Sequence, residues 1–358
     1  MTIAWIGFIT FVLFALALDL GVFHRTAHVV KVREAVIWSC IWVTLGLSFG
    51  VLVYFGYENH WFELGNTVDP VDGLINTGRT AAEKYLTGFV VEWSLSVDNI
   101  FVIAMLFGFF AVPPMYQHRV LFWGILGALA MRGVMIALGA KLIADFHWMI
   151  YVFAGLLILT SIKMLFLESE LHDPNKNIIV RMVRKSIGVT SRFHGQRFYV
   201  RAGSEASHAP AYPGAPVERD EEVERAKPGA LLLTPLALAL VMVEITDLIF
   251  AVDSIPAIFA ITGDPFLVFT SNVFAILGLR SLYFALGGMV DKFRFLKFAL
   301  AIVLMVVGLK MIFAKALKSA LGEHFNLYLL LVVVGILTMG VVASLAADRR
   351  DAKNGVQK

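Results

Sequence analysis

Apolar runs of about 20 residues recur along most of the chain. An α-helix of that length crosses a hydrocarbon core about 30 Å thick. The alternating strands of about 10 residues that mark a membrane β-barrel do not fit this pattern. The pattern therefore predicts an all-α, polytopic transmembrane helical bundle of about nine spans. The predicted spans are 3–23, 35–55, 84–111, 118–140, 147–167, 230–262, 266–289, 295–314 and 325–346.

Composition supports this class. Of 358 residues, 59% are hydrophobic and 16% are charged, and the mean hydropathy is +0.78. Soluble domains have about 45–50% apolar and about 25% charged residues, so a soluble fold could not bury this surface. We expect a lipid bilayer as partner and no nucleic acid. The first span lacks the positive segment and small-residue site of a cleaved signal, so we expect it to be retained.

Charge in the loops predicts the orientation. Lys and Arg in short loops mark the cytoplasmic side of a membrane protein. Basic residues lie between spans one and two, between spans seven and eight, and in the long segment 168–229. Acidic residues gather in 58–72 on the other side. With nine spans, this predicts an N-terminus outside and a C-terminus in the cytoplasm.

The long segment 168–229 is expected to be a cytoplasmic linker. Its part 203–228 is rich in Gly, Ser, Ala, Pro and charge, which favours a disordered, solvated loop. The basic stretch 178–201 before it has an alternative role, lying on anionic lipid.

An internal repeat organises the rest. The sequence SVDNIFVIA from Ser96 resembles AVDSIPAIFA from Ala251. Acidic residues match in the two copies, and so do basic ones further on. The matched pairs are Asp98 with Asp253, Asn99 with Ser254, Glu92 with Asp247, Arg132 with Arg280, and Lys163 with Lys310.

Spans three to five thus repeat as spans six to eight. An odd number of spans separates the copies, so the two cross the membrane in opposite senses. Inverted repeats of this kind place substrate sites near the membrane midplane between the copies. The predicted units are a helix pair at 1–55, repeat 1 at 84–167, repeat 2 at 230–314, and a last helix with its tail at 325–358.

Acidic side chains at membrane depth carry the candidate chemistry. An ionised carboxylate at the bilayer centre costs at least about 2.5–3.5 kcal/mol, so such groups normally face a cavity and a partner. Carboxylates without His or Cys beside them favour a hard divalent cation such as Mg, Ca or Mn. The candidate metal ligands are Glu92, Asp98, Asn99, Glu244, Asp247 and Asp253, with Ser254 nearby.

Helix geometry limits how these ligands meet. Asp247 and Asp253 are six residues apart, roughly 120° around a helix, as are Glu92 and Asp98. Pro256 lacks an N–H and clashes with the carbonyl of Val252. We therefore expect span six to break there and to turn its carboxylates onto one cation. Span three has no proline, and its break rests on the repeat alone.

The basic residues need roles as well. We expect Arg132 and Arg280, deep in their spans, to partner the carboxylates. Lys163 and Lys310 lie nearer the span ends, where snorkelling to the interface is expected. Asp19, near the inner end of span one, stays open between a gate, a ligand and a helix cap.

The stretches EWSLSVDN at 92–99, VEITDLIFAVDSIPA at 243–257, DLGVFHR at 19–25 and REAVIWS at 33–39 resemble the TerC/Alx family of bacterial membrane proteins. The resemblance covers almost the whole chain. It implies an inner-membrane protein associated with tellurite resistance and manganese efflux. It also implies ion binding at Glu92, Asp98, Glu244, Asp247 and Asp253. An acidic site is ill suited to an oxyanion such as tellurite, because like charges repel.

The leading hypothesis is an exporter of Mn(II), with Ca(II) as a second candidate, that exchanges the metal for protons. The alternative is a membrane scaffold or chaperone that supports metallation or folding of exported proteins, or stress resistance, without transport. Since HExxH and nucleotide-loop motifs are missing from the sequence, we expect neither an enzyme nor a cofactor.

Overall fold

The computed structural model describes residues 1–18, 31–146, 148–166, 188–212, 214–216, 219–286, 295–314, 316–317 and 325–353. Asp19 and the side chain of Asp98 lie outside this described part. The helices are α1 (Thr2–Leu18), α2 (Val32–Glu58), α3 (Gly78–Phe109), α4 (Pro114–Asp145), α5 (Met149–Phe166), α7 (Glu221–Arg225), α8 (Pro235–Phe259), α9 (Pro265–Leu277), α10 (Leu279–Leu286), α11 (Leu296–Ile312) and α13 (Phe325–Lys353). Two 3₁₀ turns, η2 (Trp61–Glu63) and η4 (Glu205–His208), and two strands, β1 (Tyr199–Arg201) and β2 (Leu231–Leu233), complete the described elements.

The all-α membrane architecture is confirmed. In the described part, 7 helical segments are long and apolar enough to cross a membrane: α2, α3, α4, α5, α8, α9 with α10, and α13. The apolar helices α1 and α11 each have 17 residues, at the short end of what spans a bilayer. The count of nine spans therefore stays a prediction.

Local sequence explains where the long helices begin. Thr77 and Thr234 cap α3 and α8, each accepting a hydrogen bond from the backbone N–H three residues on. Asp264 caps α9 in the same way. Proline begins α4, α8 and α9, where its missing N–H costs nothing. Span six was predicted from residue 230, but 231–233 forms β2 and the helix begins at Pro235.

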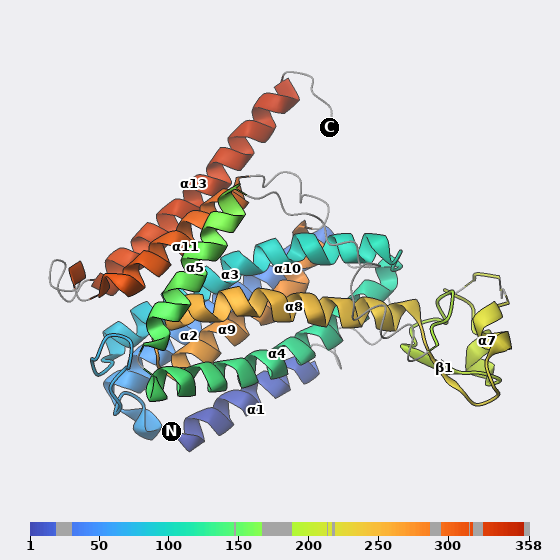
Figure 1. The fold of residues 1–358 in the computed structure, drawn as a ribbon, viewed down its shortest axis with the longest axis horizontal. Coiled ribbons are helices and arrows are strands. Elements are labelled where there is room, and N and C mark those ends of the chain that lie inside the picture. Colours follow the sequence, from blue (N-terminus) through green and yellow to red (C-terminus); the bar gives the residue numbers. More distant parts are fainter. Residues whose placement is uncertain are drawn as a thin grey trace.

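The helices pack in pairs that cross between the two predicted repeats. α3 packs against α9, α4 against α8, and α5 against α11. The first helix of each predicted repeat thus contacts the second helix of the other. In Figure 1, α3 and α8 lie side by side and run in opposite directions, as an inverted repeat requires. The repeat itself remains a prediction from the sequence.

The expected break at Pro256 is wrong. α8 continues as one α-helix to Phe259 with Pro256 inside it. Only one turn follows the proline, so one missing hydrogen bond near a helix end is tolerated without unwinding. The carboxylates of α8 therefore keep their helical separation.

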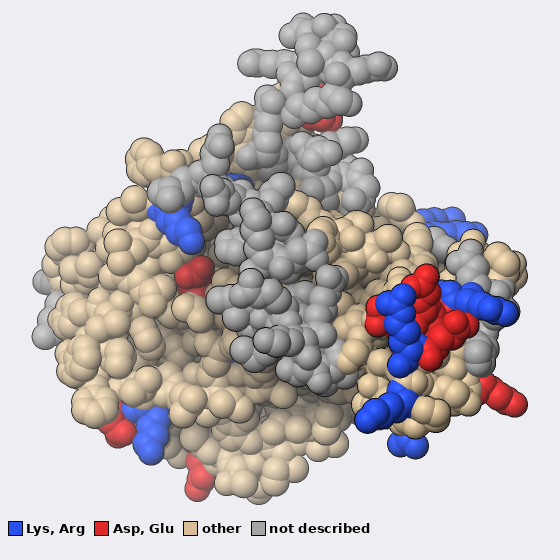
Figure 2. Space-filling model, turned by 45° about the vertical axis from the view of Figure 1, so that its right-hand side comes forward, with Lys and Arg blue, Asp and Glu red and all other residues tan. Residues whose placement is uncertain are grey.

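The expectation of a disordered linker is also wrong for its described residues. β1 and β2 pair antiparallel, with Val200 opposite Leu232, and α7 packs Val223 against them. Buried His194 contacts Asp220 Oδ2 at 3.2 Å. We call residues 188–233 the end unit. It projects from one end of the helices in Figure 1, and charged side chains gather there in Figure 2.

Candidate functional site

Arg132 is the centre of a buried charge cluster between α3, α4 and α8. Its guanidinium donates to Glu92 Oε1 on α3 and makes two bonds to Asp247 on α8, at 3.1 Å to Oδ2 and 2.8 Å to Oδ1. It also donates to Ser254 Oγ at 3.3 Å. We call Arg132, Glu92, Asp247 and Ser254 the Arg132 cluster. The prediction that Arg132 partners the carboxylates is confirmed.

Packing explains why this cluster forms. α4 lies against α8, and α3 lies against α8, so one long side chain from α4 reaches both neighbours. Arg132 and Glu92 are each 1% exposed. Taking such charges out of water costs several kcal/mol per ion, and the cost is offset only when geometry and hydrogen bonding are good. The fork of the guanidinium supplies that geometry to Asp247.

Asp253 points to a different neighbour. Its Oδ1 accepts a hydrogen bond from Thr160 Oγ1 on α5 at 2.8 Å, and Lys163 lies close enough to act on its charge. Asp247 meanwhile faces α4. The two carboxylates diverge as the ideal-helix spacing predicts, and they do not meet at one point.

Glu244 occupies a third place on α8. Its carboxylate lies directly against Gly127 of α4, where any side chain would collide with it. Glu244 is only partly buried. The three acidic residues of α8 therefore face different neighbours: Glu244 and Asp247 lie against α4, and Asp253 lies against α5.

The remaining predicted residues are placed as follows. Asn99 is buried on α3, and Arg280 is buried on α10. Neither belongs to the Arg132 cluster. The Asp98 side chain and Asp19 lie outside the described residues, so their roles stay predictions.

Within the described residues, no group of three or more His, Cys, Asp or Glu side chains is close enough together to hold a metal ion. Arg132 instead forms ion pairs with two carboxylates, Glu92 on α3 and Asp247 on α8.

Several buried polar side chains in the described part retain an atom without a hydrogen-bond partner. Among them are Glu92, through Oε2, Ser96, through Oγ, and Asn272, through both amide atoms. α9, which carries Asn272, packs against α3 and α4. The sequence pattern did not single out Asn272.

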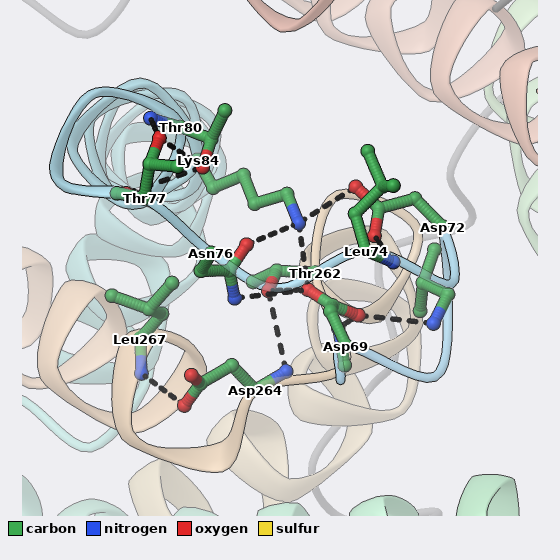
Figure 3. A network of polar contacts seen from close by, with 12 residues as sticks. Asp69, Asp72, Leu74, Asn76, Thr77, Thr80, Lys84, Thr262, Asp264 and Leu267 are labelled. Atoms are coloured by element: carbon green, nitrogen blue, oxygen red, sulfur yellow. Dashed lines mark hydrogen bonds and ion pairs between the residues drawn. The ribbon is translucent and has the colours of Figure 1, made fainter. Parts of the chain in front are cut away.

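A second polar network joins the loop after α2 to the α8–α9 turn (Figure 3). Lys84 Nζ lies 2.8 Å from both Asp69 Oδ2 and Asp72 Oδ2, and 2.6 Å from Asn76 Oδ1. Asp69 also accepts from Thr262 Oγ1 and from two backbone N–H groups. We call Asp69, Asp72, Asn76, Lys84 and Thr262 the Lys84 network.

Burial and neighbouring charges shift the pKa values of two acids in this region. Burial alone would raise the pKa of Asp69, but the Lys84 ammonium and several hydrogen bonds outweigh it and lower that pKa. Burial raises the pKa of Asp264, against the bond from Tyr57, and the charge of Asp69 raises it further. Sequence reasoning placed these acids in an outer loop, whereas Asp69 and Asp264 are buried.

Snorkelling is wrong for Lys310. Lys310 is 4% exposed, and its ammonium donates to the carbonyl of Ala260 at 2.6 Å, beside the α8–α9 turn. This contact satisfies a carbonyl at the end of α8, which is where a cation is favoured.

Sequence reasoning missed Thr160 and Lys84. Thr160 sits three residues before Lys163, on the same helix face, and that spacing was the available signal. For Lys84, the signal was a lysine six residues into an apolar helix, which requires a buried partner.

Comparison with known proteins fits this architecture. The model of the integral membrane protein TerC family matches residues 77–352. An uncharacterized membrane protein of Myxococcus xanthus is 44% identical over 96% of this chain and 92% of its own length. A Salmonella typhi protein, provisionally named membrane-bound redox modulator Alx, is 38% identical over 98% and 96%. An Escherichia coli K12 protein of the same name is 37% identical over the same shares.

No solved structure matches the chain. The family model covers both predicted repeats and the Arg132 cluster, and the relatives align over nearly their full length. The chain therefore belongs to the integral membrane protein TerC family.

Proposed function

We propose that this protein transports a divalent metal cation across the bacterial inner membrane, exporting Mn(II), with Ca(II) as the second candidate. The Arg132 cluster is the observation that carries the proposal. A buried carboxylate on α3 and a partly buried one on α8 converge on one cationic side chain among the membrane helices. Intramembrane ionisable groups of this kind mark ion pathways in transport proteins.

In the proposed mechanism, the metal competes with Arg132. Carboxylate and hydroxyl oxygens suit hard cations, and Glu92, Asp247 and Ser254 supply them. When the guanidinium withdraws, a divalent cation neutralises both carboxylates; when the cation leaves, Arg132 returns. The pocket is then never left with two unpaired negative charges, which would be costly in the membrane.

The three acids of α8 offer the cation successive binding positions on different faces of the helix. Glu244, Asp247 and Asp253 contact different helices, so movement of α4 or α5 relative to α8 changes which carboxylate is accessible. Asp98, Asn99 and Asp19 are proposed as further contributors from the repeat and the family resemblance. Exchange for protons completes the cycle, because a buried carboxyl group is favoured in its neutral form. The orientation proposed is N-terminus outside.

Metal uptake into proteoliposomes tests this function. We expect the wild type to move Mn²⁺ and Asp247→Asn to reduce uptake about 10–100-fold, since one charge of the pocket is lost. Asp253→Asn is expected to reduce uptake as well. Asp145→Asn, which changes an exposed acid at the end of α4, is the matched control and should retain wild-type uptake.

The outcomes separate the parts of the proposal. A wild type that moves neither Mn²⁺ nor Ca²⁺ would refute transport of these ions and favour the scaffold alternative. A wild type that moves Mn²⁺ together with fully active Asp247→Asn and Asp253→Asn proteins would refute the site but keep the function.

The name of the Alx relatives speaks of redox modulation. This chain has one cysteine, Cys40, which is exposed on α2. A dithiol within the chain is therefore not available for redox chemistry, and the buried charges favour ion transport.

A further inference from the structure

The hydroxyl of Ser96 lacks the hydrogen bond that several other buried hydroxyls on the membrane helices make. Five of those hydroxyls donate to a backbone carbonyl: Thr87, Ser94, Ser161, Thr270 and Ser344. Ser96 is 1% exposed, and its Oγ has no hydrogen-bond partner among the described residues. The usual self-bonding of a helical serine is therefore not what satisfies this group.

Glu92 also has a buried oxygen without a hydrogen-bond partner. Its Oε1 is bound by Arg132, whereas its Oε2 is buried without a partner. Residues 92 and 96 are four apart on α3, so they share one face. Side chains tilt toward the helix N-terminus, which leans the Ser96 hydroxyl over the turn that carries Glu92. Two unsatisfied oxygens thus lie one turn apart on the face of α3 from which Glu92 reaches Arg132.

Buried polar groups without partners cost stability, and native proteins contain few of them. Such oxygens are retained where a ligand uses them. From this juxtaposition we propose that Ser96 Oγ and Glu92 Oε2 are ligands of the transported cation, which Asp247 joins from α8 when Arg132 withdraws. The proposal rests on the transport function above and names one ligand that neither the fold nor the family match assigns.

The donor set also defines the class of cation. One neutral hydroxyl and two carboxylates are hard oxygen ligands, which suit Mn²⁺, Mg²⁺ and Ca²⁺. A soft thiolate at the hydroxyl position would favour Cd²⁺ or Zn²⁺ instead. Replacing the oxygen at residue 96 by sulfur therefore tests direct contact with the metal. If Ser96 were only structural, the replacement would not change the metal preference.

The experiment measures Mn²⁺ and Cd²⁺ binding to the purified full chain in detergent by titration calorimetry. All variants carry Cys40→Ser, so that a new cysteine is the only thiol. Ser96→Ala and Ser96→Cys are compared with Ser94→Ala and Ser94→Cys. Ser94 is the matched control, because it lies two residues away and its hydroxyl is bonded to the carbonyl of Val90.

We expect Ser96→Ala to weaken Mn²⁺ binding by about tenfold or more, at the lower end of losses seen around metal sites. Ser96→Cys should shift the ratio of Cd²⁺ to Mn²⁺ affinity toward Cd²⁺ by at least about tenfold, which corresponds to about 1.4 kcal/mol. Both Ser94 variants should keep the affinities and the ratio of the Cys40→Ser parent.

Thermal stability gives a second readout. Ser96→Ala removes an unsatisfied buried hydroxyl, so its melting temperature without metal should equal or exceed that of the parent. The added stabilisation by Mn²⁺ should shrink in the same variant, because at a given metal concentration a weaker ligand stabilises the fold less. A folded, stable protein with weakened metal binding distinguishes a ligand from a packing residue.

Each remaining outcome decides something. If the parent binds and transports Mn²⁺ while both Ser96 variants keep the parent's affinities and metal ratio, Ser96 is not a ligand and the transport function stands. A parent that binds no divalent cation overturns the proposed function, and the ligand assignment with it. Unfolding of Ser96→Ala would show that the hydroxyl is structural and would also overturn the assignment.

Discussion

Arg132 binds two acids from two helices, and its removal leaves Glu92 buried and Asp247 partly buried without this counter-ion. Breaking a buried pair in this way costs about 3–5 kcal/mol. At the residue scale, then, the charge balance matters more than any single contact. The guanidinium of Arg132 pairs with both Glu92 and Asp247 and so offsets the repulsion between the two carboxylates.

Replacing Arg132 by Gln is therefore expected to lower the melting temperature in metal-free buffer. Under the proposed function, Mn²⁺ should stabilise Arg132→Gln more than the wild type, because the tethered competitor is gone. Melting curves of both proteins with and without Mn²⁺ measure the difference. Equal stabilisation of the two proteins by Mn²⁺ would contradict competition between Arg132 and the metal.

The α8–α9 turn and the loop after α2 are held together at the element scale by the Lys84 network. Lys84 Nζ contacts three side chains of residues 69–76, and Asp69 in turn bonds the α8–α9 turn (Figure 3). Lys310 from α11 ends at the same turn, on Ala260. Elements from both predicted repeats are thus tied together at one end of the bundle.

Lys84→Met should destabilise the protein by about 3–5 kcal/mol, since Asp69 is then buried as an unpaired charge. Adding Asp69→Asn to Lys84→Met should recover part of the loss, because a neutral amide replaces the charge. Chemical or thermal unfolding of the single and double variants measures this coupling. Strictly additive losses would show that the two side chains do not act as a pair.

At the scale of the whole molecule, the membrane helices and the end unit differ in what stabilises them. The helices bury apolar side chains in two large clusters, while the end unit has a small core around Val200 and Leu232. The unit depends more on polar contacts, chiefly those of Asp220 with His194 and Ser191. We therefore expect the stability of the end unit to respond to pH through His194.

Burial lowers the pKa of His194 from its ordinary value of 6.5; Asp220 opposes this shift, and the charges of Arg192 and Arg197 add to it. A histidine whose folded pKa is depressed stabilises the fold above pH 6.5 and loses that contribution as pH falls below 6.5. Trypsin cleavage within 188–233 should accelerate between pH 7.5 and pH values about one unit below 6.5. His194→Gln cannot gain a charge and should show little change, after correction for trypsin's own pH dependence.

Two results would count against this account of the end unit. One is a cleavage rate in the wild type that does not change over the pH range. The other is an equal acceleration in His194→Gln, which would place the pH sensitivity on another group.

The sequence predicted the features that follow from length, polarity and spacing. Apolar runs fixed the membrane class, and acidic residues inside those runs required a partner, for which Arg132 was correctly chosen. These predictions succeed because the bilayer forces backbone hydrogen bonds into helices and makes unpaired charge costly. The expected convergence of Asp247 and Asp253 is wrong, because α8 stays unbroken and keeps their helical separation.

Other features depend on which helices become neighbours. Thr160 binds Asp253 because α5 contacts α8, and Lys84 reaches Asp69 because the loop after α2 folds back onto α3. Pro256 stays within α8 because it lies near the helix end, where its missing N–H removes only one backbone hydrogen bond. Contacts between distant segments are set by packing, and local pattern carries little information about them.

By itself, then, the sequence determined that the chain is a helical membrane protein with paired acidic helices and a charge-balancing arginine. The tertiary structure decided which carboxylates share that arginine, that the described part of 188–233 folds into a unit, and that Ser96 and Glu92 each keep a buried oxygen without a hydrogen bond. The physical reason is the sequence distance over which each effect acts: helix formation and the apolarity of a membrane span depend on residues that are neighbours in the chain. Partnership in a low-dielectric core depends on distances of a few ångströms between side chains far apart in sequence.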